Sequence, residues 1–466
     1  MNMINVRRLT VMTFLGAGML SGISAQVSPL QVDTLKETKI PDQWDLQSCI
    51  DYAKEQNITI RKNRITAVST QIDVKTAKAA LFPSLSFSTG HQVVNRPYQE
   101  TSSRVSGSEI ISSNSKTSYN GNYGLNASWT LYNGNKRLKT IQQEKLNNQM
   151  AELDVATSEN NIQESIAQVY IQILYAAESV KVNENTLQVS IAQRDRGQEL
   201  LNAGSIAKSD LAQLEAQVST DRYQLVTAQA TLEDYKLQLK QLLELDGENE
   251  MNIYLPALSD ENVLAPLPTK RDVYISALSL RPEIEASKLN VEASELGINI
   301  AKSSYFPTIS LSAGIGTNHT SGSDFTFGEQ VKNGWNNSIG LSVSVPIFNN
   351  RQTKSAVQKA KLQRETSMLN LLDEQKNLYK AIEGLWLDAN TAQQRYVAAQ
   401  EKLRSTQTSY ELVSEQFNMG MKNTVELLTE KNNLLSAQQE TLQAKYTAIL
   451  NAGLLRFYQG EEINLF

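Results

Sequence analysis

The amino-acid sequence predicts a mixed α and β protein built from two internal repeats, each a β-hairpin followed by a pair of long antiparallel helices. Three observations lead to this fold class. Similar segments recur at fixed offsets along the 466 residues. Some segments alternate strictly between apolar and polar side chains, which is the period of a β-strand. Long proline-free stretches carry apolar residues at coiled-coil spacing, which indicates helices of unusual length.

The first sign of duplication is a pair of matching segments. The segment at 77–90 reads AKAALFPSLSFSTG and the segment at 301–314 reads AKSSYFPTISLSAG, so the numbering is offset by 224. A second pair, YGLNASWTLYN at 123–133 and IGLSVSVPIFN at 339–349, has an offset of 216. Ordered matches of this kind are the signature of an internal repeat.

A third match, at the same offset of 216, joins the triplets Asn202-Ala203-Gly204 and Asn418-Met419-Gly420. The segment between the second and third matches therefore has equal length in both halves. Three prolines (Pro256, Pro266 and Pro268) mark a linker between the halves. The resulting division is a first repeat at 45–255, a linker at 256–270, a second repeat at 271–459 and a C-terminal tail at 460–466.

The alternating segments predict one β-hairpin in each repeat, at about 83–132 and about 307–348. Leu85 and Phe87, for example, alternate with serines on both sides, so one face is apolar and the other polar. Stretches rich in Ser, Gly and Asn, roughly 92–120 and 317–336, read as the loops of the hairpins. The pattern matches strands with lipid on one face and water on the other, although a soluble, half-buried hairpin would alternate in the same way.

The remainder of each repeat is predicted to be helical, with long helix pairs at 135–244 and 351–458. No proline occurs from 98 to 255 or after Pro346, and the apolar seam that starts at Ile162 has successive spacings of 4, 3, 4, 3 and 4. A helix over 135–202 would be about 100 Å long. Shorter helices are expected before each hairpin, at 45–81 and 272–305.

The segment 1–25 is typical of a cleaved secretory signal peptide. Arg7 and Arg8 precede a short apolar stretch, and small residues follow up to Ala25. We expect an N-terminal extension at 26–44 and no lipid anchor, because no cysteine lies near the cleavage site. No window of about 18 apolar residues occurs in the mature chain, so any membrane crossing is expected to use β-strands.

Composition and motifs argue against several classes of function. The net charge is −5, and no basic segment is interleaved with aromatic residues, so nucleic acid is not an expected partner. No catalytic residues stand out, whether as a Ser-His-Asp order, paired carboxylates or a cysteine nucleophile, so we expect neither an enzyme nor a cofactor. His91 and His319 are the only histidines, and no metal site is expected because such a site generally needs more ligands.

Four strands per chain cannot span a membrane alone, because an open sheet leaves unpaired backbone groups in lipid. Three copies would supply twelve strands, whereas the eight strands of two copies would form a barrel filled by its own side chains. We therefore expect a homotrimer whose strands contact membrane lipid. Its transmembrane β-barrel would be continued by a long antiparallel coiled-coil α-helical barrel.

Together these segments resemble the TolC family of outer-membrane efflux proteins. The resemblance covers about 40–460 and is carried by hairpins that open with FPS and FPT, by the junctions LYNGNKR and IFNNRQT, and by the segments LLNAGSIAKSDLAQLEAQ and QFNMGMKNTVELLTEKN. It implies a passive exit duct in the outer membrane of a Gram-negative cell, extending into the periplasm. A periplasmic adaptor protein and an inner-membrane pump or transporter would complete a tripartite machine that exports small molecules such as drugs.

Two alternatives stay open at this point. An outer-membrane component of a type I protein secretion system would use the same fold. A structural coiled-coil surface protein would show the long helices without lipid-facing strands.

The resemblance also implies a gate at the periplasmic end, just after the long-helix turns. The acidic constriction of the family falls on Glu426, and its basic latch residue falls on Lys422, which would face Ser209. A family tyrosine that bonds an aspartate falls on Phe417, while the aspartate is present as Asp210. Because phenylalanine has no hydroxyl group, this gate is expected to depend more on Lys422 and on packing.

The two turns themselves are the expected docking surface for the adaptor. Each lies at the far end of a long helix, and its glycine lets a partner approach the backbone closely. The alternative is a purely structural role, in which glycine serves only to end a helix. Met419 and Met421 fit adaptable apolar contacts better than a metal path. The predicted docking residues are Asn202, Ala203, Gly204, Asn418, Met419 and Gly420.

Overall fold

The computed structural model contains two helices of 67 residues each, α4 (Lys136–Asn202) and α10 (Gln352–Asn418). The structure describes residues 41–98, 102–106, 109–113, 116–246, 251–256, 263–321, 323 and 325–463. The elements described below belong to the unit Asp42–Phe466. The predicted signal peptide at 1–25 and the predicted extension up to residue 40 lie outside the described residues.

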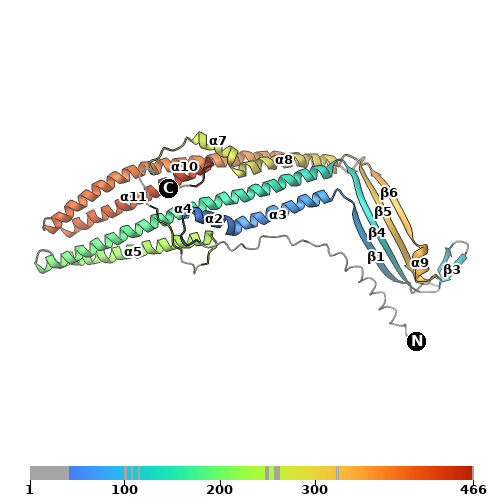
Figure 1. The fold of residues 1–466 in the computed structure, drawn as a ribbon, viewed down its shortest axis with the longest axis horizontal. Coiled ribbons are helices and arrows are strands. Elements are labelled where there is room, and N and C mark those ends of the chain that lie inside the picture. Colours follow the sequence, from blue (N-terminus) through green and yellow to red (C-terminus); the bar gives the residue numbers. More distant parts are fainter. Residues whose placement is uncertain are drawn as a thin grey trace, which may run out of the picture. The chain divides into compact units, whose positions relative to one another are not determined.

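Each long helix is followed by a return helix of 35 residues, namely α5 (Lys208–Leu242) after α4 and α11 (Thr424–Tyr458) after α10. Both pairs begin and end at equivalent positions of the repeat, with the offset that the sequence matches predict. Figure 1 shows that α4 and α5 lie side by side, as do α10 and α11. The structure therefore places two equivalent antiparallel helix pairs in one chain.

The segments 45–81 and 272–305, which were predicted to be helical, each contain two short helices. The first consists of α2 (Leu46–Gln56) and α3 (Ile58–Ala79), and the second of α7 (Lys270–Leu280) and α8 (Pro282–Ser303). Asn57 ends the first of these helices and caps the next, since its side chain accepts hydrogen bonds from Thr59 N and Ile60 N. In the second repeat Pro282 starts α8, a position where its missing N–H costs nothing.

One antiparallel sheet joins the two repeats, with the strand order β1-β4-β5-β6. Its strands are β1 (Ser84–Asn95), β4 (Thr117–Asn133), β5 (Thr308–Thr320) and β6 (Asn336–Ser344). The β4–β5 pairing is the junction between the repeats. Figure 1 shows this sheet at the opposite end of the unit from the turns between the long helices and their return helices.

The predicted loops contain more regular structure than expected. Two short paired strands, β2 (Ser102–Ser106) and β3 (Glu109–Ser113), lie within the stretch 92–120, and β1 extends into it. The stretch 317–336 contains a short helix, α9 (Phe327–Asn333). Its capping box, formed by Thr326 and Glu329, is a local helix start signal that outweighs the surrounding Ser, Gly and Asn residues.

The largest core lies where the short helices cover the long ones. It brings together residues of α2, α4, α10 and α11, with Trp44, Tyr170 and Tyr396 fully buried. The Tyr170 hydroxyl donates to the carbonyl of Tyr254 at 2.6 Å. Helix α8 contacts both α4 and α10, so the helices of the two repeats form one body.

The sheet exposes its apolar face. Ile339 is 83% exposed, and Leu85, Phe87, Leu341 and Val343 are exposed as well. Exposed apolar surface of this extent indicates a lipid or partner contact. Among the described residues, no helix is long and apolar enough to cross a membrane.

Candidate functional site

The two turns that end the long helices have nearly identical backbones. Gly204 and Gly420 adopt positive φ angles of 74° and 76°, which favour glycine. Ser205 N donates to the Leu200 carbonyl at 2.8 Å, and Met421 N donates to the Gln416 carbonyl at 2.9 Å. These bonds satisfy carbonyls at the helix ends. A Cβ atom at either glycine would meet no atom within 4 Å, so the turns are open on their outer side.

The predicted constriction residue Glu426 lies in the first turn of α11 and closes a capping box with Asn423. Glu426 N donates to Asn423 Oδ1 at 2.9 Å, and Asn423 N donates to a Glu426 carboxylate oxygen at 3.2 Å. Capping boxes fix both partners at the start of a helix. The carboxylate is therefore held at the tip of the helix pair rather than free along its side.

Lys422 contacts this same carboxylate within the chain. Its Nζ lies 2.6 Å from Glu426 Oε1, and both side chains are partly exposed. The hydrogen bond from Lys422, followed by the backbone bond from Asn423, lowers the pKa of Glu426 below its usual value of 4.5. The Glu426 carboxylate thus stays charged over the neutral range.

Ser209 and Asp210 lie at the start of α5, in the equivalent place of the first repeat. Asp210 accepts a hydrogen bond from Ala207 N at 3.1 Å and so caps its own helix. Within one chain the structure brings Lys422 to Glu426 and not to either of these residues. The expected contact concerned a neighbouring helix pair, so it stays a prediction.

Phe417 occupies an apolar cluster just behind the tips. Together with Leu214 of α5 and Leu427 of α11 it is almost fully buried. The cluster therefore contains residues of both helix pairs. At the position where the resemblance implies a tyrosine, this chain packs Phe417 against leucines from both repeats.

Sequence reasoning missed a buried polar cluster deeper between the helix pairs. Lys431 of α11 contacts Asp221 of α5 and Ser190 of α4, and all three residues are nearly inaccessible to solvent. Burial, partly opposed by Asp221, lowers the pKa of Lys431. One signal was available in the sequence, because Lys431 follows Leu427 and precedes Leu434 at seam spacing. A charged residue at a seam position suggests a buried partner.

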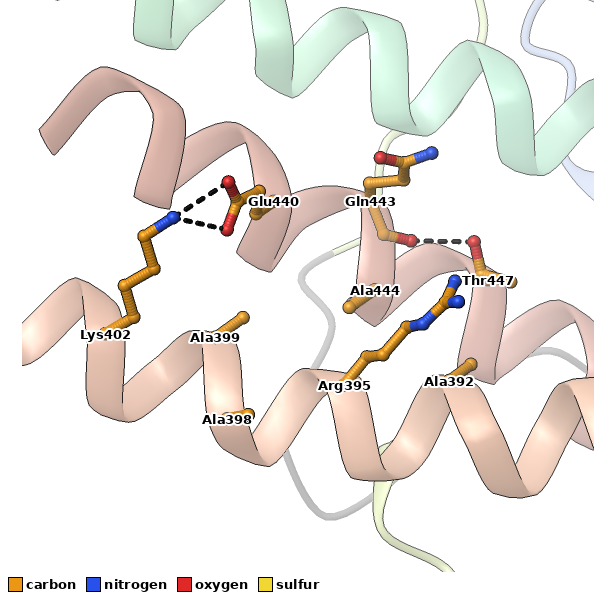
Figure 2. A pocket seen from close by; sticks show the side chains of 9 residues that line it. All are labelled: Ala392, Arg395, Ala398, Ala399, Lys402, Glu440, Gln443, Ala444 and Thr447. Atoms are coloured by element: carbon orange, nitrogen blue, oxygen red, sulfur yellow. Dashed lines mark hydrogen bonds and ion pairs between the residues drawn. The ribbon is translucent and has the colours of Figure 1, made fainter. Parts of the chain in front are cut away.

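A groove of about 460 Å³ lies between α10 and α11 (Figure 2). Small residues such as Ala392, Ala398 and Ala399 line it. Lys402 and Glu440 form an exposed ion pair at 2.8 Å beside them. No group of three or more His, Cys, Asp or Glu side chains suited to a metal ion occurs in the described part of the chain.

Comparisons with known proteins agree with this architecture. The family model described as outer membrane efflux protein matches residues 49–244 and 273–461, one stretch in each repeat. The chain therefore belongs to the outer membrane efflux protein family. Membership favours a channel over a structural coiled-coil surface protein.

Two curated relatives and one solved structure illustrate the similarity. The outer membrane efflux protein BepC of Brucella suis is 24% identical over 63% of this chain and 61% of its own length. The toxin and drug export protein A of Aggregatibacter actinomycetemcomitans is 22% identical over 89% of this chain and 87% of its own. A crystal structure of CusC superimposes with a TM-score of 0.75 at 19% identity, covering 89% of this chain and 91% of that one.

The predicted TolC-like family and its mixed α and β fold are confirmed by these findings. The matched family is one of outer membrane efflux proteins, and the two relatives are described as an outer membrane efflux protein and a toxin and drug export protein, which agrees with the predicted class of function.

Proposed function

We propose that this protein is the outer-membrane exit duct of a tripartite efflux pump, acting as a passive homotrimeric channel for small molecules such as drugs. The observation that carries the proposal is the four-stranded sheet. Its outer strands β1 and β6 each have a free edge within the described residues, and its apolar face is exposed. Three copies would close the edges into a twelve-stranded barrel surrounded by outer-membrane lipid.

The internal repeat supports assembly of copies into a ring. Helix α11 packs on α4 within the chain, and Leu442 of α11 contacts the core there. Val226 of α5 stands at the equivalent position of the first repeat, yet it is 58% exposed. A second copy that offers α10 to this face would give Val226 the contact that Leu442 has already. The helix pairs would then form a continuous α-helical barrel through the periplasm.

The gate in this proposal lies at the tips of the helix pairs. Three copies of Glu426 would form an acidic constriction. Lys422 would hold it closed, through Glu426 and through Ser209 and Asp210 of a neighbouring helix pair. The apolar cluster around Phe417 would supply the packing that replaces the missing tyrosine hydroxyl.

The partners in this proposal are a periplasmic adaptor and an inner-membrane pump or transporter. The adaptor would dock on the open turns at Ala203 and Met419, which in a trimer form six pseudo-equivalent sites. We further propose that the chain is exported with a cleaved signal peptide to the outer membrane of a Gram-negative cell, without a lipid anchor. Cys49, the only cysteine, is buried in the core, which fits the absence of lipid attachment to it.

A second candidate function is protein export through a type I secretion system. The match to a toxin and drug export protein over most of both chains favours keeping it. Two measurements test the proposals together. Purified channel in planar bilayers should conduct ions, and a cell that lacks the gene should accumulate a small-molecule drug that the parent exports. Accumulation of an unexported protein, with unchanged drug levels, would favour the secretion system instead.

A further inference from the structure

The only two histidines of the chain belong to different repeats, yet they lie in one row across the sheet. His91 of β1 and His319 of β5 both pair with Gly121 of the central strand β4. Directly paired residues point to the same face, and glycine has no side chain to separate its neighbours. The two imidazole rings therefore meet above Gly121, with their centroids 6.3 Å apart.

The ring nitrogens converge on the space that glycine leaves empty. A Cβ atom at Gly121 would lie closest to His319 Cε1, and it would lie 2.6 Å from His319 Nδ1 and 3.0 Å from His91 Nδ1. One nitrogen of each ring therefore borders the same gap, and a small rotation of the rings would let one ion bind both at the length of a metal–imidazole bond, about 2.0–2.1 Å. Any other residue at position 121 would fill this region.

His319 carries an unused donor atom for a ligand. Its side chain is 8% exposed, and the buried Nδ1 has no hydrogen-bond partner among the described residues. The ring is held by Tyr123, stacked at 5.9 Å, and by Phe327 of α9, edge-on at 5.0 Å. A buried nitrogen that lacks a partner loses its interaction with water, and a bound ion is one arrangement that would compensate for this loss.

His91 is the exposed member of the pair and lies beside an oxygen donor. Its side chain is exposed, and its Nδ1 lies 2.8 Å from the Tyr119 hydroxyl oxygen. Its other nitrogen, Nε2, lies 3.2 Å from Thr89 Oγ1. With the proton on Nε2, His91 Nδ1 accepts a hydrogen bond from the Tyr119 hydroxyl, so an ion bound to Nδ1 would take the place of this bond. The Tyr119 hydroxyl would give up its bond to His91 or become a further ligand.

We propose that His91 and His319 bind one divalent transition-metal ion per chain, of the Zn²⁺ or Cu²⁺ class, above Gly121. Imidazole nitrogen suits these ions, whereas Mg²⁺ and Ca²⁺ prefer oxygen ligands. Tyr119 or water would complete the coordination. The ion would link β1 of the first repeat to β5 of the second, two strands that do not pair directly.

The test uses full-length protein carrying an affinity tag without histidine, purified in detergent and titrated with Cu²⁺. Because the chain has two histidines, nitrogen couplings in the Cu²⁺ electron paramagnetic resonance spectrum report on this site. We expect one Cu²⁺ per chain with two coupled imidazole nitrogens. His319→Gln should leave one coupled nitrogen and weaken binding at least tenfold. Zn²⁺ should raise the unfolding temperature of the parent but not that of His319→Gln.

A pair of glycine variants on one strand supplies the matched control. Gly121→Ala should abolish the two-nitrogen signal, because the new methyl group would displace both rings. Gly124→Ala should keep the signal, since a Cβ atom there meets its nearest neighbours at an ordinary 3.4 Å. A spectrum with no coupled imidazole pair in the parent, or equal Cu²⁺ affinity in parent and His91→Gln/His319→Gln protein, would overturn the proposal. The histidines would then serve only to cover the glycine gap.

Discussion

At the scale of single residues, the two ion pairs near the tips differ in how deeply they are buried. Lys431, Asp221 and Ser190 are buried between three helices, while Lys422 and Glu426 pair at a partly exposed tip. Removing one partner of a buried ion pair leaves an uncompensated charge, which is far more costly than removing an exposed one. The buried cluster is therefore expected to hold the helix pairs together, and the exposed pair is free to rearrange.

Lys431→Met should destabilise the folded chain by about 3–5 kcal/mol, because the buried Asp221 would lose its cationic partner and keep only neutral hydrogen-bond donors. The double variant Lys431→Met/Asp221→Leu should recover much of that loss. Lys402→Ala, which breaks an exposed ion pair between α10 and α11, should cost only about 0–1 kcal/mol. Denaturant unfolding of the purified channel measures all three. A double variant as unstable as Lys431→Met would contradict this account.

Glu426→Gln should weaken block by trivalent cations added from the periplasmic side in planar bilayers. The lowered pKa predicts how this block depends on pH. A carboxyl whose folded pKa is depressed stays ionised below its usual value and loses its charge as pH falls through the lowered pKa. Block should therefore persist in mild acid, down to the usual pKa of 4.5, and disappear under stronger acid.

Lys422→Ala should shift the loss of block toward higher pH, because the hydrogen bond that lowers the Glu426 pKa is removed. It should also raise conductance if Lys422 holds the gate. An unchanged pH midpoint would contradict the pairing seen here, and an unchanged conductance would remove Lys422 from the gate.

At the scale of helices and strands, the sequence predicted the long elements well. Only a helix accommodates proline-free stretches as long as α4 and α10 in which apolar residues recur every three or four positions. Because the repeats are offset by 216 residues, a helix predicted in one repeat also predicted its counterpart in the other. The breaks at Asn57 and Pro282 were missed, since asparagine is tolerated within helices and proline also occurs at kinks. The partners of Lys431 could not be predicted, because Asp221 and Ser190 lie far away in the sequence on other helices.

The two turns should act as adaptor contacts as well as helix ends. Ala203→Glu/Met419→Glu alters neither glycine, so the turns, the trimer and membrane insertion should be retained. Export and crosslinking to the adaptor should be lost, because carboxylates would replace the small or apolar contacts on the open side. Export assays in cells and site-specific crosslinking measure this. The comparison variant is Ala398→Glu, in the groove of Figure 2. Normal export by the turn variant together with loss in Ala398→Glu would place docking in the groove instead.

At the scale of the whole molecule, one chain leaves helix and strand contacts unmade that a ring of copies would supply. Helix α11 packs on α4 of the same chain. The equivalent face of α5 has no such neighbour among the described residues, and its Tyr223 and Val226 are exposed. The sheet shows the same incompleteness at its two edges. The proposed closed ring, in which the last α5 meets the first α10, would satisfy both features at once.

Val226→Asp should therefore prevent assembly while leaving the single chain folded. Burying an unpaired carboxylate in the interface between copies costs several kcal/mol at each of the equivalent contacts. Inside one chain the same residue is exposed, so its replacement should change the free energy of unfolding of the monomer by about 0.5 kcal/mol or less. The matched control is Gln224→Asp on the same helix; its counterpart in α11, Glu440, is exposed. Native mass spectrometry in mild detergent should show trimers for the parent and for Gln224→Asp, and monomers for Val226→Asp. A Val226→Asp trimer that survives the same detergent would mean that α5 faces solvent in the assembly, and that the copies meet elsewhere.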